Sequence, residues 1–275
     1  MPFAAPDYIP FATELAREAG AVLMRHYGNV QVEHKGSFDT VTAADRASER
    51  LVVERIRSRF PSHSITAEEG GNFEGAGELI WHVDPLDGTT NFSHGLPRFC
   101  VSIGLWSRRE GLAGVVFDPV RGDMYAAERG SGAYLNSHRI RVSDEGDLGR
   151  SLFATGFPSA IRATNPNMHY FHQVAMATHG VRRTGSAALD LCAVAAGHFE
   201  GFWEIGLKSW DVAAGLVMLS EAGGEYCDFD GKRYRPGDRR IVATNGRVTS
   251  GLLELLAEVS RGHQRHALPP LDNAR

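Results

Sequence analysis

The stretch from Leu79 to His94, LIWHVDPLDGTTNFSH, constrains the fold of this chain more than any other segment. Residues 79–83 are mostly apolar and rich in strand formers, which predicts a short buried strand. Asp84 and Asp87 follow directly, so this strand delivers two carboxylates to its end. Pro85 has a fixed φ and no backbone N–H group, so we expect the regular strand to end there.

The four residues after Asp87, from Gly88 to Asn91, predict a sharp turn into a helix. Glycine permits a tight turn or a close approach to a ligand, and threonine is favoured at a helix start. Backbone N–H groups at such a turn can bind phosphate, and the preceding carboxylates can bind cations. An acidic surface turn is the alternative reading of residues 84–88 alone. Because a buried strand runs straight into this string, we favour a functional site.

Composition limits the class of protein. The chain has 275 residues, enough for one large domain or two that share a core. Its net charge of -4 argues against a nucleic-acid partner or an anionic membrane surface. We recognise no signal peptide and no membrane-spanning run. Cys100, Cys192 and Cys227 are widely spaced, as expected of reduced, buried thiols, so we expect a cytoplasmic protein.

Hydrophobic periodicity predicts a mixed chain of helices and strands. The polar run Ser143–Arg150 is the expected boundary between an N-terminal half (1–150) with the main acidic motif and a C-terminal half (151–275), together one compact unit. The glycine-rich segment 70–78 is expected to be a loop. Helices are predicted over residues 7–27, 41–60, 170–178, 185–197, 211–222 and 248–259. Strands are predicted over residues 30–33, 64–67, 79–83, 100–106, 114–118, 124–127, 133–135, 152–155, 181–184, 199–204 and 241–244.

Three further acidic positions are candidates for the same site. The strand at 64–67 ends in Glu68, and acids at the ends of neighbouring strands would pool negative charge that a cation makes tolerable. Asp211 opens the segment SWDVAAG, although the helix macrodipole alone explains an acid there. Asp45 follows Thr42 by three residues, which also fits a simple capping box.

These segments resemble the motifs of a known family. WHVDPLDGTTNFSHG and SWDVAAG are similar to the two signatures of the inositol monophosphatase family. VTAAD, AEEG, RRTGSAALDL and FWEIG occur in that family's order and at its usual spacing, so the resemblance runs to about residue 260. It is strongest with bacterial inositol-1-monophosphatases. The resemblance implies an α/β (α+β) layered sandwich of the sugar-phosphatase type, αβαβα, with mixed and antiparallel sheets and packed helices.

Carried over position by position, the resemblance also implies roles for individual residues. The implied metal ligands are the carboxylates of Glu68, Asp84, Asp87 and Asp211 and the backbone carbonyl of Leu86. The implied catalytic residues are Glu68 and Thr89, which orient the attacking water, and Asp45, which hydrogen-bonds the Thr89 hydroxyl. The implied substrate-binding residues are Gly88, Thr89, Thr90, Gly185, Ser186, Ala187, Glu204, Asp211 and Lys35.

The chemistry of this residue set agrees with the resemblance. Oxygen ligands without cysteine or histidine suit Mg²⁺ better than zinc. Two cations roughly 3.5–4 Å apart could activate a water and stabilise the leaving alkoxide, without a phospho-enzyme. We therefore expect a Mg²⁺-dependent phosphatase for inositol 1-phosphate and related polyol or sugar phosphates; the family adds lithium sensitivity and a homodimer. The alternatives are a phosphatase for histidinol phosphate or a 3′-phosphonucleotide and, more remotely, a non-catalytic interaction protein.

Overall fold

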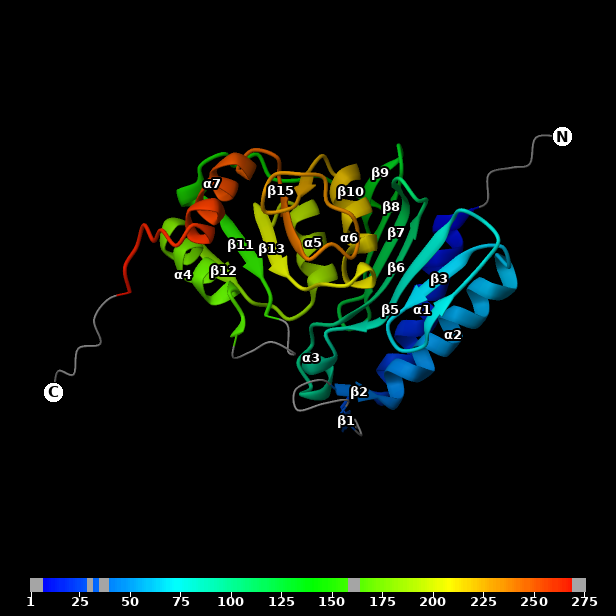
Figure 1. Cartoon of the computed structure of the whole chain (residues 1–275). Coiled ribbons are helices and arrows are strands. Elements are labelled where there is room, and N and C mark those ends of the chain that lie inside the picture. The colour runs from blue at the N-terminus through cyan, green and yellow to red at the C-terminus, as the bar shows by residue number, and fades with distance from the viewer. Residues whose placement is uncertain (1–6, 29–31, 35–39, 158–163, 269–275) are drawn as a thin grey trace.

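The computed structural model describes residues 7–28, 32–34, 40–157 and 164–268, which form layers of helices and sheets (Figure 1). The helices are α1 (Tyr8–His26), α2 (Ala43–Arg59), α3 (Thr89–Ser93), α4 (Asn167–Ala177), α5 (Ala187–Ala195), α6 (Ser209–Glu221) and α7 (Thr249–Ser260), with a 3₁₀ turn η1 (Leu148–Arg150). The strands are β1 (Val32–His34), β2 (Thr40–Thr42), β3 (Ser64–Ala67), β4 (Gly71–Phe73), β5 (Ile80–Asp87), β6 (Cys100–Trp106), β7 (Gly111–Asp118), β8 (Asp123–Glu128), β9 (Gly132–Leu135), β10 (His138–Ile140), β11 (Leu152–Thr155), β12 (Gly180–Arg182), β13 (Gly201–Ile205), β14 (Glu225–Cys227) and β15 (Arg240–Thr244).

The larger sheet has eight strands in the order β10-β9-β8-β7-β6-β5-β3-β4. All neighbours are antiparallel except β3 and β5, which run parallel. α1 and α2 cover one face of this sheet (Figure 1). Leu15 and Leu23 of α1 and Ile56 of α2 are buried there in one core with Trp81 and Ile103 of the sheet. The apolar faces of the two amphipathic helices thus supply the first core.

The second sheet has five strands in the order β12-β11-β13-β15-β14 and mixes parallel and antiparallel pairs. α5 and α6 lie between the two sheets, and α4 and α7 cover the outer face of the second one (Figure 1). The order of layers is therefore helix, sheet, helix, sheet, helix. The predicted αβαβα sandwich with mixed and antiparallel sheets is confirmed.

The middle helix α6 packs very closely on the larger sheet because two sheet positions are glycine. A Cβ atom at Gly104 would lie 2.8 Å from the nitrogen of Ala214, and one at Gly114 would lie 2.5 Å from its oxygen. The start of α6 is joined to β5 by a 3.0 Å hydrogen bond between His82 Nδ1 and Ser209 Oγ. This contact places the first turn of α6 beside the strand that carries the acidic motif.

Most predicted elements are confirmed, and four predictions need correction. The helix predicted from residue 41 begins at Ala43, because Thr40–Thr42 form the strand β2, which pairs with β1. Residues 30 and 31 of the strand predicted over 30–33 lie outside the described residues. β5 does not end at Pro85 but continues to Asp87, because a β-bulge absorbs the proline: Asp84 pairs with Ser102 and Asp87 with Cys100. The segment 70–78 is not wholly a loop, since β4 forms within it and pairs with β3. Cys227, unlike the other two cysteines, is only partly buried.

Two further features bear on the organisation of the chain. η1 lies between the last strand of the larger sheet and the first strand of the smaller one, at the position where the sequence predicts a boundary. Among the described residues, none of the helices combines the length and the apolar character needed to cross a membrane.

Candidate active site

The parallel pair β3 and β5 brings two acids to one edge of the larger sheet. Ala67 pairs with Val83, so the next residues, Glu68 and Asp84, leave the two strands side by side. Asp84 is 2% exposed, and its Oδ1 accepts a 3.0 Å hydrogen bond from the backbone N–H of Leu86 within the bulge. Burial, and then the charges of Glu68 and Asp87, raises the pKa of Asp84 well above its usual value. This edge is therefore a place of concentrated negative charge.

The turn after β5 has a backbone conformation that requires glycine. Gly88 has φ of 99° and directly precedes the five-residue helix α3. The Oγ1 of Thr89 lies 3.3 Å from Asp45 Oδ1 and 3.0 Å from the carbonyl oxygen of Leu86, and it can donate its proton to either. The hydrogen bond implied between Thr89 and Asp45 is therefore present. Residues far apart in the sequence fix the side chain of Thr89.

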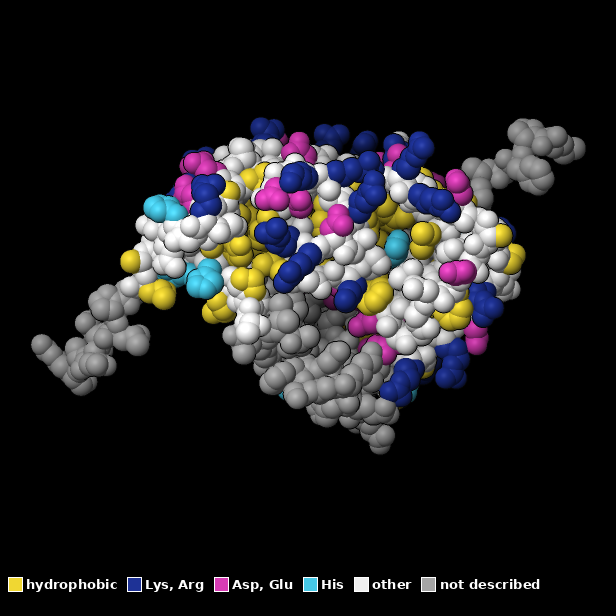
Figure 2. Space-filling view, viewed as in Figure 1, with side chains coloured by type: hydrophobic (Ala, Val, Ile, Leu, Met, Phe, Trp, Pro, Cys, Tyr) yellow, Lys and Arg dark blue, Asp and Glu magenta, His cyan; other side chains and the backbone are white. Residues whose placement is uncertain are grey.

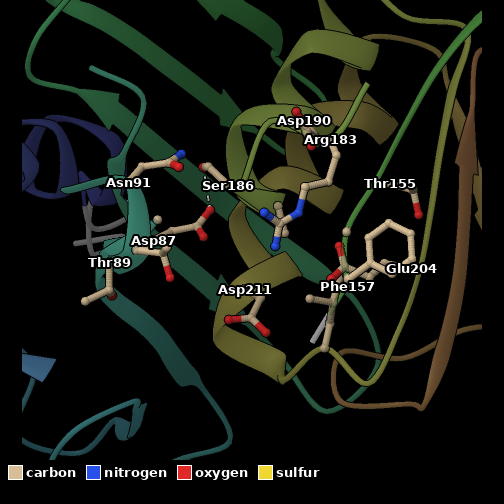
Figure 3. A pocket seen from close by; sticks show the side chains of 16 residues that line it. Asp87, Thr89, Asn91, Thr155, Phe157, Arg183, Ser186, Asp190, Glu204 and Asp211 are labelled. Atoms are coloured by element: carbon tan, nitrogen blue, oxygen red, sulfur yellow. Dashed lines mark hydrogen bonds between the residues drawn. The ribbon is translucent and has the colours of Figure 1, made fainter. Parts of the chain in front are cut away.

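The beginning of α5 is fastened to this turn from the second half of the chain. Asn91 Nδ2 donates hydrogen bonds to the carbonyl oxygens of Arg98 (2.7 Å) and Thr184 (2.9 Å). Ser186 is the N-cap of α5, and its hydroxyl donates a 2.7 Å hydrogen bond to Asp87 Oδ2 (Figure 3). These bonds hold the acidic turn and the α5 entry in fixed relative positions.

Asp211 and Glu204 add two carboxylates from the second half. Asp211, in the first turn of α6, accepts a 2.6 Å hydrogen bond from the backbone N–H of Lys208. Burial, and then the charge of Asp87, raises the pKa of Asp211 to about 7. Glu204 on β13 is 7% exposed, and burial followed by the charge of Asp211 raises its pKa well above the usual value. A Cβ atom on Gly156 would collide with the Glu204 carboxylate, so glycine makes room for it.

These groups surround one cavity of about 200 Å³. The hollow is visible in Figure 2 with acidic side chains at its edge, and Figure 3 shows its walls. The predicted residues that line it are Asp87, Gly88, Thr89, Thr90, Gly185, Ser186, Ala187, Glu204 and Asp211. Asp45, Glu68, Asp84 and Leu86 do not line the cavity but lie close behind its wall, linked to it by the contacts above. Lys35 lies outside the described residues.

Part of the cavity lining was not predicted from the sequence. The lining residues not predicted are Asn91, Thr155, Gly156, Phe157, Arg183, Asp190 and Leu207. Arg183 extends into the cavity among the acidic side chains (Figure 3). Its positive charge opposes in small part the rise in the pKa of Glu204 that burial causes. Its position two residues before Gly185 was the signal available, because a neighbour of a substrate-binding turn often shares the site. Phe157 gave no such signal.

The donor atoms fit a hard divalent cation. Four carboxylates and one backbone carbonyl offer oxygen only, which suits Mg²⁺. Burial and then the charges of the neighbouring acids raise the pKa of Asp84, and a bound cation would offset both effects. Within the described ranges, no three acidic, histidine or cysteine side chains already stand together as a ready ion-binding group. Asp211 is instead held by its own helix start, and Asp87 Oδ2 by Ser186.

Comparison with known proteins decides the family. The model of the inositol monophosphatase family matches residues 6–265. The chain belongs to this family. Its members are phosphatases, so the predicted resemblance and the predicted class of enzyme are both confirmed.

Relatives cover nearly the whole chain. The inositol-1-monophosphatase of Synechocystis sp. is 40% identical over 264 residues, which are 94% of this chain and 92% of the relative. A protein of Pseudomonas aeruginosa named Nus factor SuhB is 42% identical over 251 residues, 88% of this chain and 93% of its own. Among solved structures, an inositol monophosphatase from Anabaena is 43% identical with a TM-score of 0.83, covering 91% of this chain and 95% of that one. The Thermotoga maritima IMPase is 37% identical with a TM-score of 0.85, covering 93% and 99%.

Proposed function

We propose that this chain is a Mg²⁺-dependent phosphomonoesterase that releases inositol and phosphate from inositol 1-phosphate and acts on related polyol or sugar phosphates. The cavity carries the proposal. One wall of the cavity carries Asp87 and the backbone turn at 88–90, and the opposite wall carries Glu204 and Asp211 (Figure 3). A polyol phosphate needs this combination, because N–H groups bind its phosphate and carboxylates accept hydrogen bonds from its hydroxyl groups.

The size of the cavity favours a small substrate. Its volume of about 200 Å³ lies below the roughly 300–1,000 Å³ of pockets for drug-sized ligands. A monosaccharide-sized polyol phosphate suits this space better than a 3′-phosphonucleotide. Glu204 and the guanidinium of Arg183 offer an acceptor and a donor to hydroxyl groups of the ring. Gly185, Ser186 and Ala187 provide the neighbouring wall, and Lys35 is assigned to the rim by the family resemblance.

The proposed metal ligands are Glu68, Asp84, Asp87, Asp211 and the carbonyl oxygen of Leu86. Bound Mg²⁺ would neutralise charge on the phosphate and lower the pKa of a water molecule. The protein's own contribution is positional. Asp45 and the Leu86 carbonyl hold the Thr89 hydroxyl in place. The lone pairs of this hydroxyl and the carboxylate of Glu68 can then both accept hydrogen bonds from the attacking water and orient it. The N–H groups of the turn at 88–90 are assigned to the phosphate oxygens.

Several finer expectations belong to the same proposal. Lithium sensitivity and a homodimer follow from the family resemblance, and a cytoplasmic location from the composition. Histidinol phosphate and 3′-phosphonucleotides are the alternative substrates. A non-catalytic interaction protein is the alternative from outside the enzymes, and the name Nus factor SuhB of the Pseudomonas aeruginosa relative is the observation that favours it.

The test is phosphate release with Mg²⁺, with and without Li⁺, from inositol 1-phosphate, histidinol phosphate and a 3′-phosphorylated nucleotide. We expect fastest turnover of inositol 1-phosphate, its suppression by Li⁺, and its loss in Asp87→Asn. Preference for either other substrate would overturn the substrate assignment. Turnover that survives Asp87→Asn would overturn the site, and no turnover of any of the three would favour the binding role.

A further inference from the structure

One oxygen of Asp87 is enclosed by hydrogen-bond donors that do not belong to its own strand. Asp87 Oδ2 accepts 2.7 Å from the hydroxyl of Ser186 and 2.8 Å from the backbone N–H of Ala188. The Sγ of Cys100 lies 3.9 Å from the same oxygen and 3.6 Å from Ser186 Oγ. A carboxylate oxygen has two lone pairs, so these contacts saturate Oδ2. Asp87 also lines the cavity, and Oδ1 is the oxygen that remains to face it; the backbone N–H of Ala187 is a further donor to this carboxylate. We call the three groups around Oδ2 the Asp87 clamp.

The clamp is a built feature of the fold. Ser186 and Cys100 are 2% and 0% exposed, so water does not compete for these contacts. Cys100 is placed there by the sheet, because it pairs directly with Asp87 after the bulge. Ser186 is placed by α5, where its hydroxyl also accepts a 3.3 Å hydrogen bond from the N–H of Leu189. The same hydroxyl therefore caps α5 with its lone pair and binds Asp87 with its proton.

The turn before Ser186 fixes its direction. Gly185 has φ of +89°, and a Cβ atom on it would lie 2.9–3.2 Å from the side-chain amide of Asn91. That amide is itself bound to the carbonyl oxygens of Arg98 and Thr184. These contacts fix the backbone that leads into Ser186, the N-cap of α5, on the side of Asp87.

We propose that Ser186 is a positioning residue for a divalent cation: with the N–H of Ala188 and the wall made by Cys100, it holds Asp87 by Oδ2 and directs Oδ1 to the ion. The inference rests on the proposed function, which makes Asp87 a metal ligand. A hydroxyl-to-carboxylate hydrogen bond of this length is of the strong, charge-assisted kind. Helix α5, which belongs to the second half of the chain, therefore sets the geometry of Asp87, which belongs to the first half.

Outer partners of metal ligands typically change metal affinity by about 10–100-fold when removed. The direct test is calorimetric binding of Mg²⁺ to the metal-free full chain. Ser186→Gly removes the hydroxyl but leaves a residue that still serves at an N-cap at a cost of a few tenths of a kcal/mol. We expect its dissociation constant to rise by about 10–100-fold, and Ser186→Thr, which keeps the hydroxyl, to stay within about threefold of the parent.

A destabilised α5 could weaken binding without any role for the hydroxyl, so the matched control lies on the same helix. Val194→Ala truncates a fully buried side chain of α5 that does not line the cavity. It should lower the melting temperature and leave Mg²⁺ affinity unchanged. The proposal fails if Ser186→Gly binds Mg²⁺ like the parent, if Val194→Ala weakens binding equally, or if the parent binds no Mg²⁺. Binding without turnover of inositol 1-phosphate would sink the proposed substrate and leave the clamp standing.

Discussion

At the scale of single residues, the site depends on small side chains as much as on charged ones. Glu204 can enter the wall of the cavity only because residue 156 is glycine. The carbonyl oxygen of Gly156 is in turn held by Asn167 Nδ2 at 2.7 Å, so the backbone there cannot easily retreat. A methyl group at position 156 must therefore move the carboxylate.

This constraint gives the first prediction. Gly156→Ala should raise KM for inositol 1-phosphate by about 10-fold or more, the cost of losing a hydrogen bond to a charged group, with a smaller change in kcat. Steady-state kinetics at saturating Mg²⁺ measure both constants. Glu204→Ala should have the same effect, and the double variant Gly156→Ala with Glu204→Ala should add little, because both act through one carboxylate. Fully additive losses would show that Gly156 acts on something else.

At the scale of elements, the helix α6, which carries Asp211, packs directly on the backbone of the larger sheet at Gly104 and Gly114. Gly114→Ala would place its Cβ atom 2.5 Å from the carbonyl oxygen of Ala214. Overpacking of this kind costs about 1–3 kcal/mol, so we expect the free energy of unfolding in urea to fall by that amount. Gly146→Ala is the control, because a Cβ atom there would meet only Arg247 Cβ at 3.9 Å, an ordinary van der Waals contact, and it should change stability by less than about 0.5 kcal/mol. Equal stability of the two variants would contradict the close packing.

The same scale shows what the sequence could predict. Helices with strong periodicity and clear ends, such as α1 and α5, were predicted to within a few residues, because local pattern and tertiary packing agree. The short strands β2, β4, β10 and β14 were not predicted: three residues carry too little pattern to be recognised, and pairing with a neighbour forms them. The extension of β5 through Pro85 was missed for the same reason, since the bulge is a property of the β5–β6 pair.

The site divides in a similar way. Acids next to strand ends could be predicted, and the parallel pairing of β3 with β5 brings Glu68 and Asp84 together as the sequence suggested. The direction in which a side chain points could not be predicted from the sequence. Nothing local says that the hydroxyl of Ser186 binds a carboxylate 99 residues earlier, or that Phe157 and Arg183 reach the cavity. Those facts come from how the layers stack.

At the scale of the whole molecule, the junction between the two sheets buries an ionisable group outside the acidic motif. Asp190 is 2% exposed, lies 3.1 Å from the guanidinium of Arg98, and accepts a hydrogen bond of 2.5 Å from Thr184 Oγ1. Burial raises its pKa from 3.8 to about 7, although the hydrogen bond from Thr184 and the charge of Arg98 oppose the shift. The folded protein therefore holds a proton here that the unfolded chain releases near pH 4.

The sign of the effect on stability follows from this difference. A carboxyl group whose pKa is raised on folding contributes fully below its unfolded pKa, and the contribution is lost as pH rises toward about 7. A shift of about three units corresponds to about 4 kcal/mol as an upper bound. Asp190→Asn cannot titrate, so we expect the parent to lose stability relative to this variant between pH 5 and pH 8. Urea unfolding of both proteins in EDTA measures the difference, since the acids of the motif titrate in each. The prediction is wrong if the free energies of unfolding of the two proteins change with pH in parallel, or if the parent becomes more stable relative to the variant as pH rises. Either result would mean that the ion pair with Arg98 keeps Asp190 charged in the folded protein.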